Sequence, residues 1–283
     1  MQVRHLFSSL STRCRRHPRI ALIALAAVIV ALVAAQRLFP CLFRQFPALH
    51  EISPPRPIPT IPKNLSGLTW NEETATLFAV TNQPELVFEL TPQGQVLRQV
   101  RLRGFEDTEG IAHIKGTLFA VVEERRAILD IFHIPDNATE VDHTGAQRLQ
   151  LGPEDLKNKG FESLAYDPGT RTLHTMREGR PFVRLSIPLD GHFRPGSIQH
   201  SPIPELNVRD VASVIREPDG TLWILSEKSS CIVLLGGDGR VLRTFKLDVA
   251  PESFRPEGIT RAPDGRIFLV GEPNILAEYA LPH

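Results

Sequence analysis

The sequence predicts an all-β protein, a five-bladed β-propeller that follows one N-terminal transmembrane helix. Three features of the 283-residue chain support this fold class: a sequence motif that recurs five times, short strand patterns between polar turns, and a basic segment followed by an apolar run. The five copies of the motif begin at positions 66, 109, 162, 212 and 257, which we call the leading positions and which are 43 to 53 residues apart. A repeat of that length, made of short β-runs, is typical of a propeller with one blade per repeat.

The N-terminal segment has the pattern of a membrane anchor. Residues 1–19 form a basic tail with five arginines and no acidic residue, and an uninterrupted apolar run over residues 20–35 follows. We expect a signal-anchor helix that spans a membrane over residues 20–39, with the basic tail on the cytoplasmic side. A cleaved signal peptide is the alternative, because Val33-Ala34-Ala35 fits a cleavage site. Both interpretations place the rest of the chain outside the cytoplasm.

Charge and cysteine content narrow the function classes. The net charge of the whole chain is zero, but residues 38–283 alone carry six more acidic than basic residues. A mildly acidic domain with two tryptophans and two tyrosines argues against nucleic acid as a partner. The three cysteines, Cys14, Cys41 and Cys231, offer no metal-ligand pair, and we expect them to be structural bystanders without a disulfide framework.

The first repeat shows the strands of one blade. Strand patterns cover residues 68–70, 77–81, 86–90 and 96–102, and the last of these alternates as a half-exposed outer strand does. Turn sequences such as Pro263-Asp264-Gly265 separate the strand patterns of later repeats. The predicted propeller covers residues 63–283. A six-bladed ring is the alternative, and it would need a degenerate blade inside the second or third repeat.

The last repeat supplies only three strand patterns, around Ile259, over residues 267–270 and over residues 275–281. Residues 40–62 form a Pro-rich linker, and its part over residues 48–61 is the free candidate for the missing outer strand. Prolines are tolerated there because an outermost strand pairs on one side only. We therefore expect the two ends of the chain to close the ring together, which also removes an open sheet edge.

Polar residues recur at two places in each repeat, and most of them are glutamates. The leading positions carry Glu109, Glu162 and Glu257, with gaps at Ser66 and Ala212. A second polar position follows 14 to 16 residues later, at Asn82, Glu123, Glu178, Glu227 and Glu272. The antiparallel second strand of a blade returns to the face where the inner strand begins. Both sets are therefore expected at the mouth of the central channel.

The glutamates of the two sets are candidate metal ligands. Two carboxylates about 5 Å apart repel by roughly 3 kcal/mol at an effective dielectric constant of ~20, and a cation would relieve this repulsion. Ligand sets made only of oxygen suit Ca²⁺, whereas transition metals prefer nitrogen or sulfur. We therefore predict a calcium ion held by residues from the set Glu109, Glu123, Glu162, Glu178, Glu227, Glu257 and Glu272. Alternatively, single glutamates accept backbone hydrogen bonds or pair with nearby cations, namely Arg125, Arg177, Arg180 or Lys228.

Four segments of the chain resemble the SdiA-regulated, YjiK-like family of bacterial membrane-anchored β-propeller proteins. They are residues 64–70 (NLSGLTW), the Glu-Gly-Ile and Val-Glu-Glu-Arg segments at 109–111 and 122–125, residues 159–165 (KGFESLA) and residues 256–259 (PEGI). The basic anchor and the Pro-rich linker match as well, so the resemblance covers essentially the whole chain.

The resemblance implies a five-bladed propeller, distantly related to NHL-repeat propellers, in the periplasm on a single-pass anchor in the bacterial inner membrane. It also implies a calcium site, and the Glu-Gly and Val-Glu-Glu-Arg positions of the family match Glu109, Glu123, Glu124 and Glu162. Ala212 and Asn82 depart from the family pattern, so a fully symmetric ring of acids is not expected.

Three functions are compatible with these features. The first is a membrane-anchored, calcium-binding propeller that binds or senses a small molecule or a protein at the channel mouth. The second is a calcium-dependent lactonase or esterase of the gluconolactonase or paraoxonase type, for which Asp210 and Asn274 are conceivable further ligands or bases. The third is a metal-free scaffold for protein interactions. The sequence assigns no catalytic residue.

Overall fold

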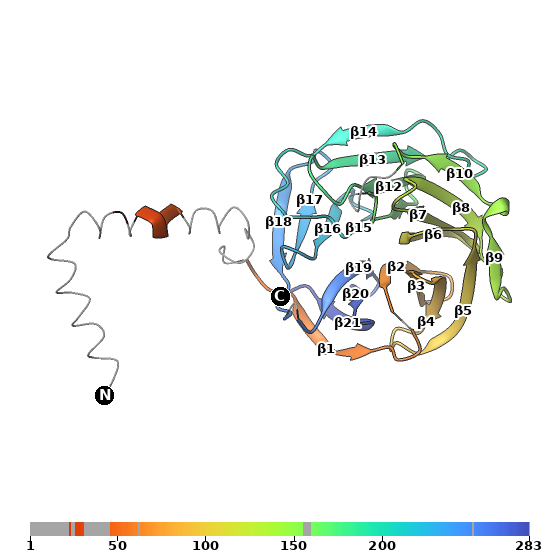
Figure 1. The fold of residues 1–283 in the computed structure, drawn as a ribbon, viewed down its shortest axis with the longest axis horizontal. Helices are drawn as coiled ribbons and strands as arrows, with labels where there is room; N and C mark the ends of the chain where they lie inside the picture. Colours follow the sequence, from red (N-terminus) through yellow and green to blue (C-terminus); the bar gives the residue numbers. More distant parts are fainter. Residues whose placement is uncertain are drawn as a thin grey trace.

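The computed structural model describes residues 23, 26–30, 46–61, 63–154, 160–250 and 252–282. Within these residues it forms five β-sheets arranged as the blades of one ring, as Figure 1 shows. This confirms the predicted all-β, five-bladed propeller, and the six-bladed alternative is wrong. Most of the predicted transmembrane helix, residues 20–39, lies outside the described residues. Among the residues that are described, no helix is long and apolar enough to cross a membrane.

The first two blades are built from consecutive hairpins. Blade 1 consists of β2 (Leu65–Asn71), β3 (Thr76–Asn82), β4 (Glu85–Leu90) and β5 (Val96–Arg103). Blade 2 consists of β6 (Thr108–Lys115), β7 (Leu118–Glu123), β8 (Ile128–His133) and β10 (Gln147–Gln150). Between β8 and β10 the chain adds β9 (Glu140–Asp142), which pairs in parallel with β5 at the outer edge of blade 1, and the short 3-10 helix η1 (His143–Gly145).

The remaining blades follow the same plan. Blade 3 consists of β11 (Ala165–Asp167), β12 (Thr172–Met176), β13 (Val183–Pro188) and β14 (Gln199–Pro202). Blade 4 consists of β15 (Ser213–Arg216), β16 (Leu222–Ser226), β17 (Cys231–Leu235) and β18 (Val241–Lys246). Blade 5 consists of β19 (Arg255–Arg261), β20 (Ile267–Glu272), β21 (Ile275–Ala280) and the N-terminal strand β1 (His50–Pro57).

Strand β1 closes the ring, as predicted from the incomplete last repeat. It pairs antiparallel with β21 (Figure 1), and the register places His50 opposite Ala280 and Pro57 opposite Ile275. The register shifts between Ser53 and Arg56, where two consecutive prolines stand. The prolines are tolerated because one edge of this strand needs no ladder hydrogen bonds.

The core lies between the blades rather than within one central cluster. Five separate groups of buried apolar side chains fill the spaces between neighbouring blades, including the space between blade 5 and blade 1. The inner and middle strands are therefore covered on both faces. This explains why their sequences are nearly continuous apolar runs, such as Leu118–Glu123 and Leu222–Ser226, instead of alternating patterns.

Close packing between inner strands explains why a small residue follows each leading position. A Cβ atom placed on Gly67 would lie 2.4 Å from the carbonyl oxygen of Glu109, and one on Gly258 would lie 2.3 Å from that of Ser66. In both cases the contact joins the inner strands of two neighbouring blades. Glycine is thus needed where the inner strands converge around the axis. Blades 3 and 4 carry Ser163 and Ser213 at this place, and the hydroxyl of Ser213 accepts a hydrogen bond from Ile259 N at 3.4 Å.

Cys231 in β17 corrects one expectation from the sequence. Its side chain is fully buried between blades, and it is disulfide-bonded. The count and spacing of only three cysteines gave no signal for this bond, because a disulfide depends on which residues the fold brings together.

Candidate functional site

The five leading positions meet at one end of the central channel. Their side chains line a single cavity of about 350 Å³, and they are Ser66, Glu109, Glu162, Ala212 and Glu257. The other residues of the cavity wall come from the ends of the second strands and from the segments just before the inner strands. They are Asn82, Asp107, Glu124, Arg125, Glu178, Asp210, Glu227, Lys228 and Arg255. The structure therefore brings together five of the seven predicted glutamates: Glu109, Glu162, Glu178, Glu227 and Glu257.

Glu123 is not part of the cavity wall, and its neighbour Glu124 takes the place predicted for it. Glu123 lies opposite Thr108 in the ladder between β6 and β7. Equivalent pairs in other blades are Leu65 with Thr81 and Phe161 with Arg177. In each pair one residue lies at or near the end of the second strand of its blade: Glu123, Thr81 or Arg177. The next residue along the chain lines the cavity, namely Glu124, Asn82 or Glu178. Because side chains alternate along a strand, an assignment that is one residue early selects the opposite face.

The spacing in the sequence contained a signal for Glu124. Asn82, Glu178 and Glu227 follow their leading positions by 15 or 16 residues, whereas Glu123 follows by 14 and Glu124 by 15. Asp107 and Asp210 were also missed as members of the predicted ring. Each stands two residues before a leading position. Asp107 has a positive φ of 59°, so the chain turns just before β6 and directs this residue to the same mouth.

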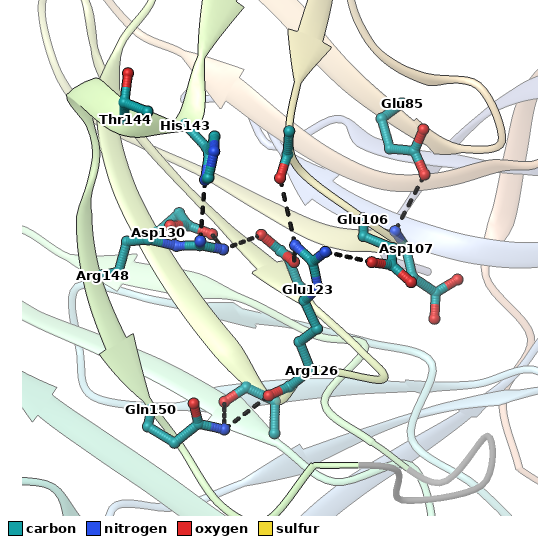
Figure 2. A network of polar contacts seen from close by, with 12 residues as sticks. Glu85, Glu106, Asp107, Glu123, Arg126, Asp130, His143, Thr144, Arg148 and Gln150 are labelled. Atoms are coloured by element: carbon teal, nitrogen blue, oxygen red, sulfur yellow. Dashed lines mark hydrogen bonds and ion pairs between the residues drawn. The ribbon is translucent and has the colours of Figure 1, made fainter.

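Glu123 instead belongs to a buried ionic network on the outer side of blade 2. Figure 2 shows Arg148 of β10 lying between the carboxylates of Glu123 and Asp130. Its Nη2 atom lies 2.6 Å from Glu123 Oε1, and its Nε atom lies 2.7 Å from Asp130 Oδ1. Arg126 contacts the other oxygen of Glu123 at 3.1 Å. Both carboxylates are fully buried, so burial and the nearby charge of Asp130 raise the pKa of Glu123 to about 8.

Replacement of Arg148 by methionine is expected to destabilise the propeller by about 2–4 kcal/mol at pH 9, because two buried carboxylates lose their main cation. Lowering the pH to 6 should recover part of this loss, since Glu123 then carries a proton in both proteins. Urea unfolding of the full chain at both pH values measures the effect. Arg240, which pairs with Asp238 at an exposed site, is the matched control. Its replacement by methionine should change the stability by less than about 1 kcal/mol. Equal losses in the two variants would contradict the role assigned to Arg148.

Glu272 also lies outside the cavity wall. Its Oε1 atom accepts a hydrogen bond from the backbone N–H of Asn64 at 2.6 Å, which links blade 5 to the start of blade 1. For this residue the structure matches the alternative interpretation, in which a glutamate at a blade end accepts backbone hydrogen bonds. A role as a metal ligand stays a prediction for all seven glutamates.

Glu109 is held by two neutral side-chain donors from blade 1. Ser66 Oγ donates a hydrogen bond to its Oε2 atom, and Asn82 Nδ2 donates one to its Oε1 atom, both at 2.5 Å. Burial raises the pKa of Glu109 to about 8, although these two hydrogen bonds act in the opposite direction. Ser66 and Asn82, the two positions without an acid in the first repeat, thus serve as neutral donors to the acid of the second repeat.

Three other glutamates of the cavity are without such partners. Among the described residues, none donates a hydrogen bond to the carboxylate of Glu162, Glu227 or Glu257 at direct contact distance. Burial and the charge of Glu178 raise the pKa of Glu162 well above its ordinary value. Burial and the charge of Glu272 raise the pKa of Glu257 to about 7. Burial also raises the pKa of Glu227. Lys228 offsets part of the repulsion at all three carboxylates, and Arg255 does so at Glu227 and Glu257, but their pKa values stay raised.

Asp210 and Glu178 are held by groups from the end of β16 and the loop after it. Asp210 accepts a hydrogen bond from Ser226 Oγ and from the backbone N–H of Lys228 at 3.1 Å. The ammonium of Lys228 contacts Glu178 Oε1, which joins blade 4 to blade 3. The alternative that pairs glutamates with nearby cations is therefore correct for Glu178.

The oxygen atoms of the cavity fit a hard cation. Two groups of carboxylates have oxygens within 4.8 Å of one another: Asp107, Glu109 and Glu124, and then Glu124, Glu162 and Glu178. Glu124 is shared by both groups, and one of its oxygens accepts a hydrogen bond from Gly160 N at 3.0 Å. Asn82 Oδ1 is buried and has no hydrogen-bond partner among the described residues. A buried acceptor without a donor, beside clustered carboxylates, matches the all-oxygen ligand set that calcium prefers.

The stability of the metal-free protein should fall as the pH rises from about 5 to 8. Glu109 and Glu257 have pKa values of about 8 and about 7, and both lie above the ordinary value of 4.5. Between pH 4.5 and pH 8 the folded chain binds more protons than the unfolded chain. The free energy of unfolding is therefore highest below pH 4.5 and decreases as the pH rises to 8.

Thermal melts of the metal-free chain in steps of one pH unit measure this loss. The E109Q variant keeps a neutral side chain at every pH and should show a flatter profile. Identical profiles for the two proteins would show that Glu109 is ionised in the metal-free fold.

Comparisons with known proteins agree with the fold. Glutaminyl cyclase from Myxococcus xanthus is 17% identical with a TM-score of 0.57, and the match covers 83% of this chain and 98% of that chain. The protein described as calcium-binding regucalcin from Agrobacterium tumefaciens is 11% identical with a TM-score of 0.50, and the match covers 84% of this chain and 96% of that chain. At these identities the likeness shows the fold alone. The sequence profile of the SdiA-regulated family matches residues 48–280. The chain therefore belongs to the SdiA-regulated family.

Proposed function

We propose that this protein is a calcium-binding propeller that serves as a binding or sensing module, with the ion in the acidic cavity at the channel mouth. The single observation that carries the proposal is the cluster of eight carboxylic acids on the wall of one cavity against three cationic side chains. Such an excess of buried negative charge is costly unless protons or a cation neutralise it.

The residues that would hold the ion are Glu109 and Glu124, with Asp107 and Glu162 on either side and Asn82 Oδ1 as a neutral acceptor. A bound Ca²⁺ would neutralise the converging carboxylates and tie blades 1, 2 and 3 together at the axis. The protein's own contribution is to aim these oxygens at one place. The backbones of Glu109 and Glu162 lie against Gly67 and Gly110 of neighbouring inner strands, and Glu124 N donates a hydrogen bond to Asp107 O at 2.9 Å. Ser66 and Gly160 N orient two of the carboxylates. Regucalcin, which shares the propeller fold, is described as a calcium-binding protein, and this lends support to calcium over other hard cations.

A hydrolase is less well supported than a binding module. Asp210, the acid that a lactonase-like mechanism would use, already accepts hydrogen bonds from Ser226 and Lys228. Asn274 contacts Ile61 O through Nδ2 at 2.8 Å and is not part of the cavity wall. Neither residue is placed as a free base beside the clustered carboxylates.

We further propose that residues 20–39 anchor the propeller to the inner membrane, with the propeller in the periplasm. The basic tail before the apolar run supports this orientation. The disulfide of Cys231 is in keeping with an oxidising compartment, where such bonds persist. Protease treatment of spheroplasts should degrade the propeller without lysis of the cells. Protection until the inner membrane is broken would contradict this location.

Calcium titration of the full-length, metal-free chain in mild detergent tests the proposed function. We expect saturable heat in calorimetry and a melting temperature that rises with calcium. At a hundredfold excess of calcium over Kd the expected stabilisation is about 2.7 kcal/mol. Magnesium should have a weaker effect, because it requires a smaller octahedral site and gives up water reluctantly. The absence of both heat and stabilisation at millimolar calcium would refute a calcium site.

A further inference from the structure

We propose that Lys228 is a built-in cation that occupies one half of the acidic cavity and so limits the cavity to a single bound calcium ion. This inference rests on the proposed calcium function. It concerns a lysine that the calcium site itself does not require.

The cavity offers two groups of carboxylates, and they are similar in composition. Asp107, Glu109 and Glu124 form the first group, and Glu124, Glu162 and Glu178 form the second. In each group the carboxylate oxygens lie within 4.8 Å of one another. Judged by the acids alone, each half of the cavity could take a cation, with Glu124 between them.

The two halves differ in the cation that the protein supplies. In the second group the ammonium of Lys228 contacts Glu178 Oε1 directly. In the first group Arg125 Nε lies 3.2 Å from Asp107 Oδ2, but this contact is not a hydrogen bond, because Asp107 Oδ2 has no hydrogen-bond partner among the described residues, and the charge of Arg125 is spread over the guanidinium. The other two acids of the first group are contacted only by neutral donors: Ser66 and Asn82 for Glu109, and Gly160 N for Glu124. The first half is therefore open to a cation, whereas a compact positive charge already fills the second.

The backbone holds Lys228 in this position. Its N–H lies 3.1 Å and 3.2 Å from the two oxygens of Asp210, and Ser226 Oγ binds the same carboxylate. The base of the lysine side chain is thus fixed at the cavity wall before its ammonium reaches across to blade 3. An ammonium that contacts Glu178 from this fixed backbone position repels a second divalent ion from the same carboxylates.

The number of calcium ions bound by the full-length chain tests this role. We expect one ion for the wild type and two for K228M, counted by calorimetry and by native mass spectrometry of the metal-loaded protein. K228R keeps the charge and should bind one ion. The double variant K228M/E178Q lacks a carboxylate of the second group and should return to one ion. K228Q keeps a polar side chain of similar length and replaces K228M if the latter fails to fold.

Arg255 provides the matched control. It is also a cation of the cavity wall, but among the described residues it forms no hydrogen bond or ion pair with either carboxylate group. R255M should therefore bind one ion, as the wild type does. A merely structural ion pair between Lys228 and Glu178 would change the melting temperature of K228M and leave the count at one.

Each outcome has a distinct meaning. One ion in the wild type and two in K228M support the inference. One ion in both proteins, or two in the wild type, overturns it and leaves the calcium function standing. No ion in any of the proteins refutes the calcium function itself.

Discussion

Replacement of Glu124 by glutamine is expected to abolish most of the stabilisation that calcium provides. Glu124 is the one acid that belongs to both carboxylate groups, and the residue is only 5% exposed. The glutamine keeps an acceptor for Gly160 N but removes a charge beside the ion. With excess calcium, the wild type should melt roughly 5–10 °C higher than without it, from about 2.7 kcal/mol of binding energy and a domain of this size. For E124Q the shift should be about 2 °C or less.

Glu272→Gln is the matched control for this experiment. Glu272 belongs to the glutamates predicted from the repeat, but it lies outside the cavity wall and accepts a hydrogen bond that glutamine can also accept. E272Q should therefore keep the full shift with calcium. A calcium shift that survives in E124Q and disappears in E272Q would place the ion elsewhere and overturn the site described above.

Replacement of Gly67 by alanine is expected to cost about 3 kcal/mol of stability, because overpacking of a close contact must displace backbone. The added Cβ atom would lie 2.4 Å from Glu109 O and 2.9 Å from Ile111 N. Both neighbours are backbone atoms of the next inner strand, so no flexible side chain can move aside. A loss of this size lowers the melting temperature by roughly 10 °C in a domain of this length. Since Glu109 itself would be pushed outward, calcium affinity should weaken as well.

Gly145→Ala tests whether the effect comes from the close contact or from the loss of a glycine. No atom lies within 4 Å of a Cβ added at Gly145. We expect a change within about 0.5 kcal/mol. Denaturant unfolding of both variants, with and without calcium, gives the comparison. A similar loss in both variants would show that the inner-strand contact is not what requires glycine at position 67.

The repeat in the sequence was sufficient for the blade count and for the general location of the acids. Repeats of 43 to 53 residues correspond to the five sheets, and all five leading positions line one cavity. The missing strand of the last repeat was also predictable, because three strand patterns leave an open edge that only the N-terminal segment could cover. These inferences depend on local residue patterns and on the order of the repeats along the chain, and both are directly visible in the sequence.

The repeat does not assign single side chains to the cavity, and Glu123 shows the reason. Two adjacent glutamates both fit the repeat within its scatter, yet they face opposite sides of the same strand end. Which one reaches the cavity depends on the register between β6 and β7, where shifts occur between Thr108 and Gly110 and between His113 and Lys115. Such irregularities arise from the packing of neighbouring blades and leave no clear trace in the repeat.

By itself, the sequence determined a five-bladed ring closed by its own N-terminal strand, with acids gathered at one mouth of the channel. Only the tertiary structure decided which acids are free to bind an ion. Glu123 forms an ion pair with Arg148 of an outer strand, and Glu178 forms one with Lys228 of the next blade. Glu272 accepts a hydrogen bond from the backbone N–H of Asn64. Each of these partners lies 25 or more residues away along the chain or in another blade. The charge state of a carboxylate follows from its neighbours in space, and the order of residues along a repeat does not contain that information.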